Sequence, residues 1–150
     1  MPQNEKFVVS CQHCSLNALC IPHSLTMEKM DIIDTMIKRA KPLHKNNRIF
    51  ETGDPFNSVF AVRSGAFKSF SIDESGEEHV VGFFLPGELI GLDAIDGSTH
   101  ENTVKALETS SSCEIPFHQI EKLSAKIPNL QRHMYRLLSR EIREDQELQL

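Results

Sequence analysis

The chain has 150 residues, 39% of them hydrophobic and 25% charged, which suffices for one core of ordinary size and hardly for two. Its formal net charge of −5 argues against these residues gripping DNA by themselves, because phosphate contacts need a basic surface. No apolar run approaches the roughly 18 residues of a membrane helix, and residues 1–10 lack the features of a secretory signal, so we expect a cytoplasmic domain without membrane contact.

The first predicted element is a loop over residues 1–23 that shows no hydrophobic period and contains the stretch CQHCSLNALC. From residue 24 the pattern changes, because Thr26 can cap a helix and apolar residues then recur at helical spacing until Pro42. These apolar residues are Met27, Met30, Ile33, Met36 and Ile37. The pattern predicts a short amphipathic helix that packs on something larger.

Short strands separated by Gly, Pro, Asp and Ser are predicted between residues 47 and 117. The strand sequences are RIFE, SVFAVR, AFKSFSID, HVVGFF, ELIG, TVKALE and SSCEIPF. Residues 74–77, with the sequence ESGE, are typical of a hairpin tip. Regularly spaced strands with turn signals predict an antiparallel β-roll or sandwich, and with the flanking helices the fold class is α+β.

A long helix is predicted at the C-terminal end, after one or two helical turns within residues 117–126. Pro128 suits its first turn, and its apolar residues form two stripes. Leu130, Met134 and Leu137 suit packing on the β-roll, whereas Tyr135, Leu138, Ile142, Asp145 and Gln149 follow alternating steps of three and four, as in a dimer seam. The helical pattern is still running at Leu150 without a cap residue, so we expect a longer protein.

Four cysteines carry the strongest chemical signal. The cytosol keeps thiols reduced, which favours metal binding or redox sensing over disulfides. Cys11, Cys14 and Cys20 lie within one polar loop, where three thiols have no packing reason to be, while Cys113 follows in a predicted strand. For Cys113 alone, an ordinary buried cysteine is the simpler interpretation. The hypothesis of a metal site therefore rests on the three cysteines of the loop, and Cys113 is added as the fourth ligand.

Two kinds of metal site are compatible with four thiolates. An iron–sulfur cluster needs four sulfur ligands around a bulky core, and a loop can wrap around it more easily than a stiff helix. Structural zinc also accepts four thiolates, but usually as two CxxC pairs on separate knuckles. The spacing of the cysteines alone leaves both possibilities open.

Long collinear motifs resemble the FNR branch of the CRP/FNR transcription regulators, from about residue 11 to residue 150. The motifs are CQHCSLNALC followed by Ile21-Pro22, GDPFNSVFAVRSGAFKSFSIDESGEE, FFLPGELIGLDAI, ALETSSSCEIPF and IPNLQRHMYRLLSREIREDQE. The resemblance implies a cluster-binding loop over residues 1–23, a β-roll sensory domain with short flanking helices over residues 24–126, and a dimerisation helix over residues 127–150. The helix-turn-helix DNA-binding domain of full-length members is absent from this sequence.

The resemblance also implies a function, that of an oxygen sensor for anaerobic gene regulation rather than an enzyme. One 4Fe-4S cluster per subunit would be held by Cys11, Cys14, Cys20 and Cys113, and oxygen would convert it to 2Fe-2S and then remove it. The cluster would stabilise a homodimer that binds promoter DNA and RNA polymerase through the full-length protein. The hairpin from Asp73 to Glu78 resembles a family loop that touches RNA polymerase, although an acidic solvated turn has the same composition.

A physical reason for a poised dimer comes from Asp145 at the predicted seam. Two copies of this carboxylate brought together out of water would repel each other, which keeps the dimer near its threshold. Binding of a cluster would tie the N-terminal loop to the β-roll and favour pairing of Tyr135, Leu138 and Ile142. The alternative is that Asp145 points to solvent.

Other functions receive less support from the sequence. A cyclic-nucleotide site needs an arginine for the phosphate, and the chain has Gly87-Glu88 but reads Thr99-His100-Glu101-Asn102 where the arginine is due, so no cyclic nucleotide is expected. A cupin-type enzyme would need clustered histidines, whereas the seven histidines here are scattered and suit surface or structural places. A zinc-stabilised interaction domain would use the same four thiolates.

Overall fold

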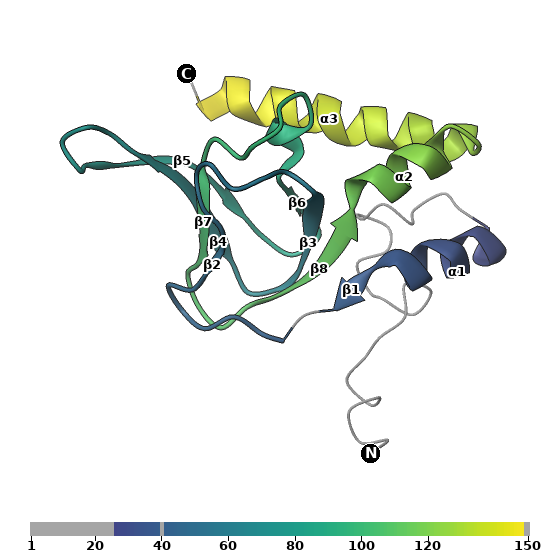
Figure 1. Ribbon diagram of the computed structural model, residues 1–150, viewed down its shortest axis with the longest axis horizontal. Helices are drawn as coiled ribbons and strands as arrows, with labels where there is room; N and C mark the ends of the chain where they lie inside the picture. Colours follow the sequence, from purple (N-terminus) through teal and green to yellow (C-terminus); the bar gives the residue numbers. More distant parts are fainter. Residues whose placement is uncertain (1–25, 40, 149–150) are drawn as a thin grey trace, which may run out of the picture. The chain divides into compact units, whose positions relative to one another are not determined.

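The computed structural model describes residues 26–39 and 41–148, whose helices and strands are labelled in Figure 1. These residues divide into two compact units. The helices α1, α2 and α3 belong to one unit, and the strands of residues 37–116 form the other. The domain limits at residues 23 and 126 stay a prediction.

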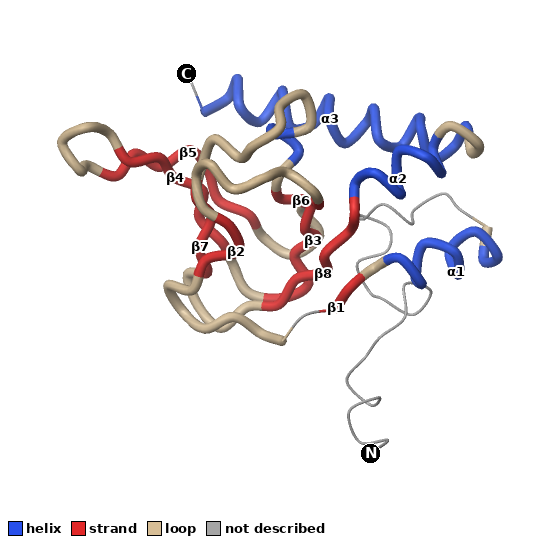
Figure 2. Tube along the Cα trace, in the orientation of Figure 1, coloured by secondary structure: helices blue, strands red, loops and turns tan. Residues whose placement is uncertain are grey.

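The strand unit consists of two four-stranded antiparallel sheets, drawn in red in Figure 2. One sheet has the order β1-β8-β3-β6 and the other the order β2-β7-β4-β5. The strands are β1 (Lys38–Arg39), β2 (Arg48–Phe50), β3 (Ser58–Ser64), β4 (Phe67–Ile72), β5 (Glu78–Phe84), β6 (Leu89–Ile90), β7 (Thr103–Ala106) and β8 (Ser111–Pro116). The prediction of an antiparallel β-roll is confirmed, and each predicted strand is present.

The core of the roll lies between the two sheets, because both contribute inward-facing side chains to it. Its buried members are Phe50, Val62, Phe67, Ile90, Val104 and Ala106. Val62 and Ile90 come from the first sheet, whereas the others come from β2, β4 and β7 of the second. Aromatic and β-branched residues alternate with outward-facing residues in these strands, and burial of such side chains is the main stabilising contribution.

The turn between β3 and β4 depends on a glycine. Gly65 has φ +83°, and a Cβ atom added there would lie 2.0 Å from Oγ of Ser110. That hydroxyl is buried and accepts a hydrogen bond from the Ala66 amide at 3.1 Å. A side chain at position 65 would therefore meet both a strained backbone and an occupied space.

The helical unit contains α1 (Met27–Met36), α2 (Phe117–Ser124) and α3 (Pro128–Leu148). Thr26 caps α1 as predicted, since its Oγ1 accepts the Lys29 amide at 3.4 Å. The prediction that this helix continues to Pro42 is wrong, because β1 intervenes and its backbone pairs with β8. No helix in the described part of the chain is long and apolar enough to cross a membrane.

The first predicted stripe of α3 is buried. Leu130, Met134 and Leu137 are only 0%, 7% and 4% exposed. Pro128 begins the helix, where the missing amide hydrogen of proline costs no hydrogen bond. These positions agree with the helical period read from the sequence.

Candidate functional site

Cys113 lies in the middle of a sheet, in the strand β8. It is paired on both sides, opposite Arg39 of β1 and Ala61 of β3. Ala61 is in turn opposite Leu89 of β6, so one row of residues crosses all four strands of the sheet. Pairing on both sides fixes the backbone position of the cysteine, which suits a residue that must hold a ligand in place.

Toward β3, the thiol of Cys113 shares its face of the sheet with small and apolar side chains. Directly opposite residues of antiparallel strands point to the same face, so Cys113 faces the same way as Ala61, and Val59 and Ile115 lie on that face as well. Val59 and Ile115 are fully buried, while Cys113 itself is half-buried. Apolar surroundings of this kind limit access of water to a metal–thiolate group.

The other three predicted ligands, Cys11, Cys14 and Cys20, lie outside the described residues. Among the residues that the structure describes, Cys113 alone of the predicted set is therefore located, and the four-thiolate site stays a prediction. The donor set fits an iron–sulfur cluster chemically, because all four groups are cysteine thiols and none must come from another residue type.

The predicted dimer seam lies on a solvent-facing side of α3. Tyr135 and Ile142 are 61% and 59% exposed, and Leu138 is half-buried. Asp145 falls within α3, but its side chain is outside the described part. Large apolar side chains exposed two turns apart on one helix are typical of an association surface.

Arginines flank this exposed stripe. Arg132 and Arg136 lie on either side of Tyr135 in sequence, and all three line one shallow hollow with Asn129 and Ser139. The aromatic ring of Tyr135 and the two arginine side chains thus line the same hollow on the surface of α3. Aromatic residues and arginine are enriched at the centres of protein interfaces.

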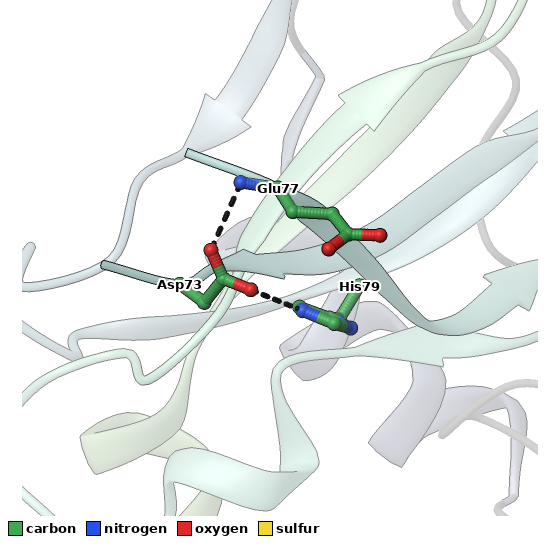
Figure 3. Close-up of side chains that lie close together, drawn as sticks. All are labelled: Asp73, Glu77 and His79. Atoms are coloured by element: carbon green, nitrogen blue, oxygen red, sulfur yellow. Dashed lines mark hydrogen bonds and ion pairs between the residues drawn. The ribbon is translucent and has the colours of Figure 1, made fainter. Parts of the chain in front are cut away.

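A second group of potential ligands lies at the tip of the β4–β5 hairpin, where Asp73, Glu77 and His79 come close together (Figure 3). The Asp73 carboxylate accepts the Ser75 amide and hydroxyl at 2.9 and 2.6 Å and the Glu77 amide at 2.9 Å, and its other oxygen contacts His79 Nε2 at 2.7 Å. The hydrogen bond from the Ser75 side chain, followed by that from His79, holds the pKa of Asp73 far below its ordinary value. These bonds close the hairpin turn itself.

Hydrogen bonds between Leu85 and Glu88 form a tight turn around Gly87. The Glu88 carboxylate accepts the Leu85 amide at 3.0 Å, so it is engaged within its own turn. Where the sequence lacks the phosphate-binding arginine, His100 is buried at 4% exposure. Sequence reasoning treated His100 as one scattered histidine and missed its place in the interior, because its neighbours Thr99, Glu101 and Asn102 are polar.

A comparison with protein families matches residues 40–126 to the cyclic nucleotide-binding domain. This match covers more than half of the chain and includes strands β2 to β8 and the helix α2. The chain belongs to the cyclic nucleotide-binding domain family. Its curated relatives are anaerobic regulators of the CRP/FNR family.

Two curated relatives illustrate the branch of the family. The transcriptional activator protein Anr of Pseudomonas aeruginosa is 54% identical over 140 residues, which are 93% of this chain and 57% of that protein. The fumarate and nitrate reduction regulatory protein of Escherichia coli is 46% identical over 140 residues, 93% of this chain and 56% of that protein. The chain thus spans a little over half of these relatives, and their names confirm the prediction that it is not an enzyme.

Solved structures of the family share the fold. The sensor domain of the regulator DNR from Pseudomonas aeruginosa superimposes with a TM-score of 0.75 at 14% identity, covering 98% of this chain and 95% of that one. The catabolite activator protein of Thermus thermophilus gives a TM-score of 0.70 at 25% identity, covering 86% of this chain and 61% of that one. These likenesses confirm the roll with its accompanying helices as the fold.

Proposed function

We propose that this chain is the oxygen-sensing and dimerisation part of a cytoplasmic FNR-type regulator of anaerobic metabolism. The observation that carries the proposal is the place of Cys113, half-buried on an apolar face and fixed between two strands of the sheet. Relatives named as anaerobic regulators support the same function, at 46% identity for the protein of Haemophilus influenzae.

Four thiolates would hold the cofactor, one 4Fe-4S cluster per subunit. Cys113 would supply the ligand from the roll, and Cys11, Cys14 and Cys20 would supply the others from the N-terminal segment. The bound cluster would react with oxygen, which protein side chains alone do slowly. The half-buried state of Cys113 and its apolar neighbours would limit the access of water to this ligand.

The response to oxygen would be a change of the monomer–dimer equilibrium. With all four cysteines engaged, the N-terminal segment is tied to β8, and this favours pairing of α3 with its copy through Tyr135, Leu138 and Ile142. Asp145 opposes this pairing because two like charges meet at the seam. Loss of the tie in air would then return the chain to monomers.

DNA and RNA polymerase would be bound by the longer protein of which such a chain is part. The charge of −5 supports the view that DNA is not bound by these residues themselves. The β4–β5 hairpin extends well beyond β2 and β7 in Figure 1, and it exposes Ile72 and Val80 near its acidic tip and Phe83 at the other end of β5. An exposed apolar hairpin suits contact with a protein partner, and we assign RNA polymerase to this surface.

The experiment that tests the cofactor is elemental analysis of protein purified without air. Iron and acid-labile sulfide in a ratio of about one to one, at about four of each per chain, are expected for a 4Fe-4S cluster. About one zinc per chain without sulfide would support the alternative of a zinc-stabilised interaction domain and overturn the proposed sensor.

A further inference from the structure

The ring of His100 is packed as an aromatic residue inside the roll. It stacks on Phe50 with ring centroids 3.6 Å apart and planes inclined by 12°, and it meets the edge of Phe56 at 5.5 Å. Its Nδ1 atom is buried and has no hydrogen-bond partner among the described residues. A titratable group is therefore held in the place of a hydrophobic side chain.

The same residue joins two segments of the roll through its backbone. The His100 amide donates to Asp54 O and the Gly53 amide donates to His100 O, each at 2.8 Å. Two positions earlier, the Phe56 amide donates to Ser98 O at 2.9 Å. The stretch of residues 91–102, which includes the short 3-10 helix η2 (Leu92–Ala94), is thus fastened to the loop of residues 53–56 around the histidine.

Protonation would disturb this arrangement. Three uncharged residues lie against the ring, namely Phe50 of β2, Phe56 of the loop and Gly91 just before η2. The charged groups that face the ring are the carboxylates of Asp54 and Asp93. Both carboxylates already accept hydrogen bonds from other groups: Asp54 accepts the Glu51 amide at 2.8 Å, and Asp93 accepts the Asn102 side-chain amide at 3.2 Å. A charged imidazole would leave a buried N–H without an acceptor, which is costly.

We propose that His100 is an acid-sensitive latch: its neutral ring holds residues 91–102 closed on the loop of residues 53–56, and proton uptake releases this stretch from the roll. The inference concerns the roll itself and is independent of the cysteine site.

The expected sign follows from the direction of the pKa shift. Burial lowers the pKa of His100 below its ordinary value of 6.5, while Asp93 and Asp54 act in the opposite direction. A histidine with a lowered pKa contributes full stability above its ordinary pKa and loses it as the pH falls below that value. Because the opened state binds protons more readily, the equilibrium constant for opening of residues 91–102 can rise by up to about tenfold between about pH 7.5 and about pH 5.5.

Hydrogen exchange of the full 150-residue chain tests the latch. Protection of peptides covering residues 51–57 and 96–103, expressed relative to the unfolded chain at each pH, is expected to fall by up to about tenfold over this range. The His100→Phe variant keeps the stacking without a titrating group and is expected to show no such change. The matched control, His118→Phe at an exposed position of α2, should behave like the native chain.

Two results would overturn the proposal: native protection that does not depend on pH in these peptides, or an equal loss of protection in His100→Phe. If that variant does not fold, an NMR titration of the native chain decides. The imidazole of His100 and the Phe56 amide should then change with the same midpoint below 6.5. Midpoints that differ between the two groups contradict a latch.

Discussion

Cys113 lies directly opposite Ala61 where β8 and β3 pair, so the thiol and the methyl group share one face of the sheet. The preceding residue, Ser112, is opposite Val62 and points to the other face. Ser112 and Cys113 are thus adjacent, half-buried and similar in size, but their side chains point to opposite faces of the sheet. This difference provides a matched pair of variants for the proposed cluster ligand.

The Cys113→Ser variant is expected to lose iron and sulfide while keeping the fold. A hydroxyl group replaces the thiol at nearly the same volume, so packing is retained, but the four-thiolate set is broken. Iron content of anaerobically purified protein measures the effect, and the circular dichroism spectrum checks the fold. Ser112→Ala should keep the full iron content, and iron retained in Cys113→Ala, which offers no ligand atom in place of the thiol, would remove this residue from the site.

Asp145→Ala is expected to favour the dimer even in air. Removing the carboxylate from each copy removes a repulsion at the seam, and a gain of about 1.4 kcal/mol corresponds to a tenfold lower dissociation constant. Analytical ultracentrifugation of the aerobic protein measures this constant. Glu147→Ala, which removes a charge from a helix position outside the predicted seam, should leave the constant unchanged. An aerobic Asp145→Ala protein that stays monomeric would contradict the seam.

Two glycine variants separate backbone strain from a steric clash. Gly53 and Gly65 have similar φ values of +93° and +83°, but a Cβ at position 53 meets nothing within 4 Å, whereas one at position 65 would lie 2.0 Å from Ser110 Oγ. Gly53→Ala is expected to lower the free energy of unfolding by about 1 kcal/mol. Gly65→Ala should lower it by at least about 2 kcal/mol more. Urea unfolding measures both, and equal losses would contradict the clash at Ser110.

The hydrogen bonds of the Asp73 carboxylate at the hairpin tip are expected to persist to a lower pH than the ordinary pKa of an aspartate would allow. Because hydrogen bonds from Ser75 and His79 lower the pKa of Asp73, its contribution is present above the ordinary value of 3.8 and is lost only as the pH falls through a lower value. The chemical shift of the Asp73 carboxyl carbon should therefore show no titration step near 3.8. A carboxyl-carbon shift of Asp73 that moves with a midpoint near 3.8 would contradict the effect of the Ser75 and His79 hydrogen bonds.

The strands and α3 were predictable because their signals are local. Alternation around Val59 and Phe60 indicates a strand, and Pro128 marks the beginning of a helix that the structure confirms. The strand β1 was missed because two residues carry no period, and its existence depends on the open edge of β8. Non-local pairing of this kind cannot be derived from the residues of the short strand.

The candidate site was predictable in its residue types but not in its surroundings. The cysteine spacing indicated a thiolate site, yet nothing in SSSCEIPF shows that Cys113 is paired on both sides or shares a face with Ala61. His100 was missed for the same reason, because its burial depends on Phe50 and Phe56, which lie far away in the sequence. Tertiary contacts decide both cases.

The central claim is that a cluster on four cysteines sets the monomer–dimer equilibrium. Its most direct test is to record the visible absorption and the size of anaerobically purified protein before and after exposure to air. The account predicts a brown dimer that bleaches and dissociates in air. A colourless protein that contains zinc and keeps the same size in air would contradict it.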